Sequence, residues 1–246
     1  MGRPVVEICI ESVDDARAAA GVDRLELCQA LAVGGLTPSI GVQKAVREFT
    51  KVPLMTMIRP RPGGFCYSET EYSVMRRDID AAVEAGSDGI VFGILNESGE
   101  VDIARSRQIV RQIRSCDRPL DIVFHRAFDF TPDPFESLNR LIDLAVTRVL
   151  TSGQQPTAIG GAALIRTLVE RAAGRIQILP GGGIRPENVR TLLDQTGCDQ
   201  VHASLRAVIS DPSVASRNVP LGATSDESSF TATDAELVRS LLSAVK

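Results

Sequence analysis

Short runs of Val, Ile and Leu alternate with helix-like segments along the whole chain, and this alternation limits the possible folds more than any other feature. The runs are mostly continuous, which is typical of parallel strands buried on both faces. Helix start signals lie between them, such as the capping box of Ser68 and Glu71. We therefore expect eight strands, each followed by a helix, at 5–10, 24–28, 54–59, 89–95, 120–126, 148–152, 176–179 and 200–204.

Eight β/α units in 246 residues predict a (β/α)8 barrel, which typically has about 250 residues. The predicted fold is thus α/β, with one TIM-type barrel domain over 1–246. Gly-x-Asp recurs before the second, fourth and eighth strands, at Gly21, Gly86 and Gly197, as expected for a chain of repeated units. A doubly wound open sheet would need fewer strands and a glycine fingerprint after the first strand, which this sequence lacks.

A long polar segment, 210–231, follows the eighth strand and precedes a final helix expected over 233–246, capped by Thr233 and Glu236. Loops of this length without structure of their own are uncommon in compact domains. The segment leaves the end of the barrel at which barrel enzymes hold their substrates. A lid, a subunit contact and a plain linker to the last helix all remain open.

Composition excludes some classes of function. Charged residues make up 24% of the chain and the formal net charge is −4, which argues against binding to nucleic acid or to an anionic membrane surface. No apolar run approaches the roughly 20 residues that span a bilayer, and Arg3, Glu7 and Glu11 interrupt the N-terminal stretch, unlike a signal peptide. Five cysteines without a Cys-x-x-Cys pair predict free thiols in the cytoplasm.

The first two strands each carry a Glu followed two places later by a Cys, namely Glu7 with Cys9 and Glu26 with Cys28. Side chains alternate between the faces of a strand, so each pair shares one face. A carboxylate within an apolar strand is costly to bury unless it is paired or bound. Because the pattern occurs in consecutive strands, we expect both pairs to line one polar cavity.

The only two histidines, His125 and His202, also fall at the carboxyl ends of predicted strands. Histidine is the side chain best suited to move protons near neutral pH. A single histidine in a strand is more often a packed core residue. The two together with Glu7, Glu26 and Arg59 favour a catalytic or binding site at the barrel mouth.

Three consecutive glycines after the seventh strand, Gly181 to Gly183, precede a helix expected to start at Pro186. Loops at this place in a barrel often hold phosphate, because glycine lets backbone N–H groups approach the anion. The alternative is a tight turn that needs positive φ. The candidate ligand-binding residues at this rim are Arg61, Asp129, Ser152, Gly181, Gly182, Gly183 and Ser204.

The paired strand cysteines permit a metal site. Adjacent strands lie about 4.8 Å apart, so Cys9 and Cys28 could approach, and soft thiolates select Cu(I). Neighbouring barrel strands contribute to alternate layers, which would stagger the two sulfurs. Inert packing is the alternative, because free cysteine is commonly buried.

Several other chemistries are excluded by the sequence. Only Lys44, Lys51 and Lys246 are lysines, and none lies on a strand at the mouth, so a Schiff-base mechanism lacks its amine. Two histidines cannot form a three-histidine zinc site. There is no Gly-x-Ser-x-Gly elbow and no P-loop. A cysteine nucleophile assisted by a histidine stays possible without a supporting motif.

A series of motifs runs in order from the first strand to the eighth and on to Arg217-Asn218. They are Glu7-Ile8-Cys9, Arg24-Leu25-Glu26-Leu27-Cys28, Gly34-Gly35-Leu36-Thr37-Pro38-Ser39, Met57-Ile58-Arg59-Pro60-Arg61, Phe124-His125-Arg126-Ala127-Phe128-Asp129, Leu150-Thr151-Ser152-Gly153 and Pro180-Gly181-Gly182-Gly183. Together they resemble the CutC family. The resemblance implies a cytoplasmic, homo-oligomeric (β/α)8 barrel of copper homeostasis, with Cu(I) bound at Cys9 and Cys28.

Two functions from different classes follow. The resemblance favours a copper-homeostasis protein that binds Cu(I). The polar residues at the mouth favour an enzyme that acts on a small anionic or phosphorylated metabolite, in which Arg59 and the glycine loop hold the anion. Proton exchange would then fall to the residues Glu7, Glu26, His125 and His202. A protein that senses a small ligand without chemistry is a third hypothesis.

Overall fold

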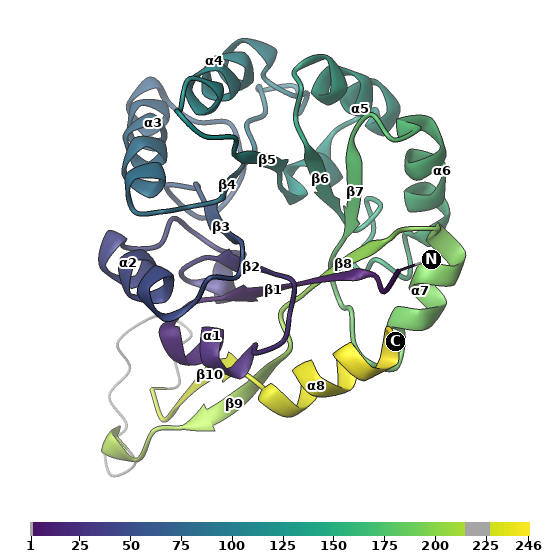
Figure 1. The fold of residues 1–246 in the computed structure, drawn as a ribbon. Coiled ribbons are helices and arrows are strands. Elements are labelled where there is room, and N and C mark those ends of the chain that lie inside the picture. Colours follow the sequence, from purple (N-terminus) through teal and green to yellow (C-terminus); the bar gives the residue numbers. More distant parts are fainter. Residues whose placement is uncertain (1, 215–226) are drawn as a thin grey trace.

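The structure is a computed structural model that describes residues 2–214 and 227–246. Among these residues, eight parallel strands form one sheet in the order β7-β6-β5-β4-β3-β2-β1-β8 (Figure 1). A parallel bridge between Gly181 and His202 joins β7 to β8 and closes the barrel. The strands are β1 (Val5–Ile10), β2 (Arg24–Leu27), β3 (Leu54–Met57), β4 (Gly89–Phe92), β5 (Asp121–Phe124), β6 (Arg148–Thr151), β7 (Gln177–Pro180) and β8 (Gln200–Ala203). The predicted TIM-type barrel is confirmed.

Helices surround the barrel, one between each pair of consecutive strands and one after the last (Figure 1). They are α1 (Val13–Ala18), α2 (Ile40–Phe49), α3 (Glu69–Glu84), α4 (Ile103–Arg114), α5 (Pro134–Asp143), α6 (Ala162–Ala172), α7 (Val189–Thr196) and α8 (Ala235–Ala244). Short 3-10 turns, η1 (Leu31–Val33), η2 (Arg126–Phe130) and η3 (Pro212–Val214), lie in the connections. None of the helices in the described part of the chain is long and apolar enough to cross a membrane.

The helix starts agree with the sequence at α3 and shift at α7 and α8. The capping box of Ser68 and Glu71 is present at α3. At α8 the cap is Asp234 and not Thr233, because the Asp234 carboxylate accepts hydrogen bonds from the next backbone N–H groups. The helix expected from Pro186 begins only at Val189, since turns occupy the residues between.

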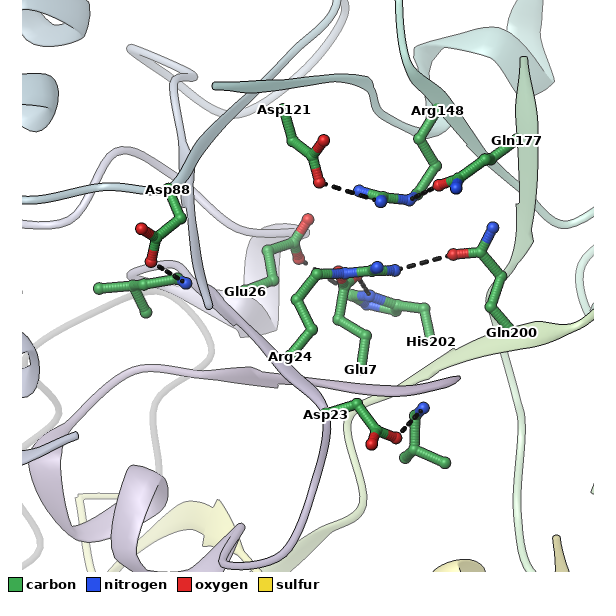
Figure 2. Close-up of polar contacts among 12 residues, drawn as sticks. Glu7, Asp23, Arg24, Glu26, Asp88, Asp121, Arg148, Gln177, Gln200 and His202 are labelled. Carbon is green, nitrogen blue, oxygen red and sulfur yellow. Dashed lines mark hydrogen bonds and ion pairs between the residues drawn. The ribbon is translucent and has the colours of Figure 1, made fainter. Parts of the chain in front are cut away.

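The repeated Gly-x-Asp motif has a structural role. Gly21, Gly86 and Gly197 adopt left-handed φ angles of 89°, 91° and 72°, which end the preceding helices. The aspartates that follow the first two glycines then accept hydrogen bonds from a neighbouring strand. Asp23 accepts from Val6 N–H at 2.8 Å, and Asp88 accepts from the first residue of β3 at 2.9 Å (Figure 2). The glycine of the motif therefore ends the helix, and the aspartate supplies a hydrogen-bond acceptor for a backbone N–H near the start of a neighbouring strand.

Apolar packing inside the barrel comes from β3 to β7 and from Cys28. Met55, Met57, Val91, Val123 and neighbouring residues form a small cluster inside it, separate from the large core between sheet and helices. Strands β8, β1 and β2 instead contribute buried polar side chains. The interior thus has an apolar side and a polar side, and the polar side carries the candidate site.

Both ends of the expected loop 210–231 form strands instead. Residues Arg206–Ser210 (β9) and Ser229–Thr233 (β10) pair antiparallel outside the barrel (Figure 1). Asp15 ties this pair to the barrel, because its carboxylate accepts from Thr233 N–H at 2.7 Å and lies 3.4 Å from Arg206 Nη1. Residues 215–226, which include Arg217 and Asn218, lie outside the described residues, so the role of the segment stays a prediction.

Candidate functional site

A pocket of about 780 Å³ opens at the carboxyl ends of the strands. Four side chains from β1, β2 and β8 lie at its polar side: Cys9, Glu26, Cys28 and His202, here called the donor cluster. All four are buried. The loops that follow β2 to β5 supply much of the remaining wall, including Leu31, Arg59, Phe65, Leu95, His125 and Phe130.

Glu7 lies behind the donor cluster and holds His202. The two residues face each other on neighbouring strands, and His202 Nδ1 lies 2.7 Å from Glu7 Oε1. On its other side, His202 Nε2 lies 3.7 Å from Glu26 Oε2. The ring is therefore fixed between two carboxylates from β1 and β2, with its Nε2 edge toward the donor cluster.

A layer of charged and amide side chains fills the barrel on the other side of Glu7, and we call it the charged layer (Figure 2). Arg24 pairs with Glu7 through Nε and donates from Nη2 to Gln200 at 2.9 Å. Arg148 donates to Asp121 at 3.0 Å and to Gln177 at 2.9 Å. Both arginines are buried, and these contacts compensate their charges apart from Arg148 Nη1, which has no hydrogen-bond partner among the described residues.

The charged layer sets the protonation of the carboxylates. Burial by itself raises the pKa of Glu7, but Arg24 and His202 outweigh it and lower that pKa to about 2. For Glu26 burial is again the largest cause, and because the charge of His202 offsets it only in part the pKa is raised. Burial lowers the pKa of His202, yet Glu26, Cys9 and Glu7 raise it well above its ordinary value. The pKa values of the two carboxylates are therefore shifted in opposite directions, down for Glu7 and up for Glu26.

Three atoms of the donor cluster lie close enough to share one ion. One ligand atom each from Cys9, Glu26 and His202 lies within 4.8 Å of the others. Cys28 Sγ lies 3.5 Å from Glu26 Oε2. The strand register places Cys9 beside Glu26, so Cys28 sits two residues nearer the mouth and the two cysteines are staggered. Burial raises the pKa of both thiols.

His125 lines the same pocket from the residue after β5 but does not contact His202 in the network above. Its Nδ1 accepts a hydrogen bond from Ala127 N–H at 3.1 Å. Burial, then the charge of Arg59, lower its pKa to about 3, so the ring is neutral at physiological pH. A Cβ at Gly93 would lie 2.4 Å from the ring, so glycine there makes room for it.

Arg59 and Arg61 use their guanidinium groups mainly on loop backbone. Arg59 donates to the carbonyl oxygens of Val33, Gly35 and Gly63 at 2.8–3.0 Å, which fastens the loops after β2 and β3 to each other. Arg61 donates to the carbonyls of Pro62, Gly64 and Cys66 and pairs with Glu71. Both line the pocket, but they first of all shape its wall.

The other predicted rim residues lie away from the pocket lining that the described residues form. Asp129 accepts hydrogen bonds from Thr151, Ser152, Gln154 and Arg126, so it fastens the loops after β5 and β6. Gly181 N–H donates to Thr151, and Gly182 and Gly183 adopt φ of 107° and 69°, as a turn requires. Ser204 is exposed beyond β8. The anion-binding role of these residues stays a prediction.

Sequence reasoning passed over the aromatic side of the pocket and the charged layer. Phe65 and Phe130 come from loops, with ring centroids 5.6 Å apart, and no periodicity marks them. Arg24 and Arg148 did carry a signal. Arg24 precedes Glu26 by two places and so shares its face of the strand, and Arg148 opens β6.

A model of the CutC family matches residues 4–207. The chain belongs to the CutC family. The human copper homeostasis protein cutC homolog is 42% identical over 243 residues, which cover 96% of this chain and 87% of the human protein. A CutC family protein of Treponema denticola is 48% identical over 199 residues, which cover 80% of this chain and 79% of the relative.

Solved structures agree with this membership. CutC from Streptococcus agalactiae superposes with a TM-score of 0.77 at 37% identity, covering 82% of this chain and 98% of that structure. Phosphoribosylanthranilate isomerase from Pyrococcus furiosus has a TM-score of 0.56 at 13% identity and covers 98% of both chains. At that identity the second similarity shows the barrel fold alone, whereas the first extends the CutC assignment to the three-dimensional structure.

Proposed function

We propose that this CutC protein binds Cu(I) in the donor cluster and serves copper homeostasis in the cytoplasm. The observation that carries the proposal is the convergence of Cys9, Glu26 and His202 ligand atoms within 4.8 Å. The names of the human and mouse relatives, which refer to copper homeostasis, point the same way.

The donor set fits a soft ion. Thiolate sulfur is the ligand that Cu(I) prefers, and imidazole is a good second donor. Glu7 is ionised and therefore accepts a hydrogen bond from His202 Nδ1–H, which turns Nε2 toward the donor cluster. We assign Cys9 and His202 from this convergence as copper ligands, together with Cys28, whose Sγ lies beside Glu26 at its edge. Glu26, 3.5 Å from Cys28 Sγ, would receive the proton of that thiol, and the protons of the Cys9 thiol and of His202 Nε2 would leave to solvent when Cu(I) binds.

Anaerobic titration with Cu(I) in competition with a coloured chelator tests the proposal. We expect the wild-type chain to bind a single ion, and Cys9→Ser, Cys28→Ser and His202→Asn each to weaken the affinity. Cys116→Ser is the matched control, because Cys116 is half-buried and lies outside the pocket lining. Unchanged affinity in the Cys9→Ser, Cys28→Ser double variant would show that the thiols are not the ligands.

The cytoplasmic location and a homo-oligomeric state belong to the same proposal. Free thiols ready to bind Cu(I) persist only under reducing conditions. Fractionation of cells that produce the chain tests the location, and sedimentation of the purified protein tests the assembly. A strictly monomeric protein at working concentrations would remove the oligomer from the proposal and leave copper binding intact.

The acid–base enzyme hypothesis is not favoured by the comparisons. Three of the solved enzymes that share the barrel are 11–16% identical to this chain, and identity at this level shows the fold alone. Glu7, Glu26 and His202 do form a buried network suited to proton exchange, but the same contacts orient a metal ligand.

A further inference from the structure

The pocket is far larger than a single ion needs. Its volume of about 780 Å³ falls within the roughly 300–1,000 Å³ of small-molecule sites. One water molecule takes up only about 30 Å³. Away from the donor cluster the wall is mainly apolar, with Leu31, Met57, Phe65, Leu95 and Phe130. Walls of this kind suit an organic molecule with an apolar body.

Two buried donors at this wall have no acceptor among the described residues. They are Arg59 Nε and His125 Nε2, on side chains whose residues are only 6% and 3% exposed. A buried N–H without an acceptor costs roughly 1–3 kcal/mol. Native proteins leave few such groups unpaired, and a water or ion bound beside them is one explanation.

Nε2 of His125 is a donor for a geometric reason. Nδ1 already accepts from Ala127 N–H, so in the neutral ring the proton sits on Nε2. Neither buried group can satisfy the other, because both donate. A single partner that satisfies both groups must therefore bring acceptor oxygens, and the positive charge of Arg59 favours an anion.

Phe65 connects the two donors. Its ring centroid lies 5.0 Å from that of His125 and 5.3 Å from the guanidinium carbon of Arg59. Phe65 therefore lies against both side chains, and because both N–H groups are fully buried, a ligand oxygen can reach them only after a side chain of this wall moves. Phe130, 68% exposed, then stands at the outer side of the same aromatic wall.

We propose that the pocket binds a small organic carboxylate, whose two oxygens accept from Arg59 Nε–H and His125 Nε2–H and whose apolar body lies between Phe65, Phe130 and Leu95. Two free donors match the two oxygens of a carboxylate. A phosphate would need more donors than these two, since Arg61 and Arg126 at the same pocket are paired with Glu71 and Asp129, and it would leave charged oxygens against apolar walls. The inference does not depend on Cu(I), because neither donor belongs to the donor cluster.

Calorimetric titration of metal-free protein, with chelator present, tests the proposal with 3-phenylpropionate as the probe. We expect 3-phenylpropionate to bind, while 3-phenylpropylammonium (the same body with a positive charge) and inorganic phosphate do not. His125→Asn keeps an acceptor near the Nδ1 position and removes the donor at Nε2. It should weaken binding by about tenfold or more, which corresponds to roughly 1.4 kcal/mol.

His125→Gln is the conservative variant, because its amide N–H falls near Nε2, and its affinity should stay within about threefold of the wild type. The double variant Cys9→Ser, Cys28→Ser should bind the carboxylate as the wild type does even if it has lost Cu(I). This arm separates a failure of the carboxylate site from a failure of the copper proposal.

Nitrogen-15 spectra of the imidazoles give a readout that requires no variant. The chain has only two histidines, so their signals can be assigned. Addition of 3-phenylpropionate should shift the Nε2–H signal of His125. Absence of binding, equal binding of the ammonium compound, or an unchanged His125 signal would each overturn the proposal.

Discussion

His202 Nδ1 lies 2.7 Å from Glu7 Oε1, across 195 positions of the sequence. Glu7 remains ionised, since Arg24 and His202 outweigh the effect of burial and lower its pKa to about 2. Nδ1 therefore donates, and Nε2 points to the donor cluster. A carboxylate that holds a histidine in this way is typical of metal sites.

Glu7→Gln should weaken Cu(I) binding by about 10–100-fold, the usual cost of losing a carboxylate behind a metal-binding histidine. The chelator competition described above measures it. Asp121→Asn is the control, because Asp121 belongs to the charged layer but pairs with Arg148. Equal affinity in both variants would mean that His202 does not bind the ion.

Arg24→Met should destabilise the fold by about 3–5 kcal/mol, because it leaves the buried Glu7 carboxylate without its main partner. Urea unfolding measures the change. Adding Glu7→Gln to Arg24→Met should restore much of the loss, since the unpaired charge is gone. Arg3→Met, which breaks a partly exposed pair with Asp23, should cost only about 0–1 kcal/mol.

Acid should destabilise the protein in two pH ranges. The pKa of His125 is lowered from 6.5 to about 3, so the unfolded chain takes up its proton first and stability falls from pH 6.5 toward 3. Glu7, lowered from 4.5 to about 2, adds a loss as pH falls through that range. Urea midpoints at several pH values should show that His125→Gln weakens the first phase. Parallel curves for variant and wild type would contradict a neutral buried His125.

Cu(I) affinity should rise with pH, because burial raises the pKa of the Cys9 and Cys28 thiols and the ion displaces their protons. Each proton released contributes about a tenfold gain per pH unit below the thiol pKa. Competition titrations between pH 6 and 9 measure the slope. A flat profile would exclude thiolate ligands.

Glu26→Gln should raise the stability of the folded chain by about 1 kcal/mol at neutral pH, a typical gain when a functional group is removed from a buried site. The physical reason is that burial raises the pKa of Glu26, so its ionised form is disfavoured in the fold. Thermal unfolding measures the change. A clear loss of stability would assign Glu26 a structural role.

The sequence predicts the barrel well because its signals are local and repeated. Continuous apolar runs, caps such as Ser68 and the Gly-x-Asp turns all depend on neighbouring residues. Part of the donor cluster could be predicted for a related reason, since Cys9 and Glu26, like Glu7 behind them, interrupt strands that otherwise carry apolar residues. Strand periodicity also places them on shared faces.

What the sequence could not predict depends on long side chains and loops. Arg59 and Arg61 were expected to face an anion, yet their terminal nitrogens donate chiefly to backbone carbonyls, and no pattern indicates where a flexible arginine will point. Phe65 and Phe130 reach the pocket only through loop conformations. The start of α8 at Asp234 shifted by one residue because two neighbouring polar residues can both cap a helix.

The charged layer closes one end of the barrel. Arg24, Arg148 and their partners occupy the interior behind Glu7, so the barrel is open at its carboxyl end and closed at the other. Whatever enters must leave by the route it came. A protein that delivers copper and one that receives it would have to use the same opening in turn. An organic ligand bound above the thiols would block both.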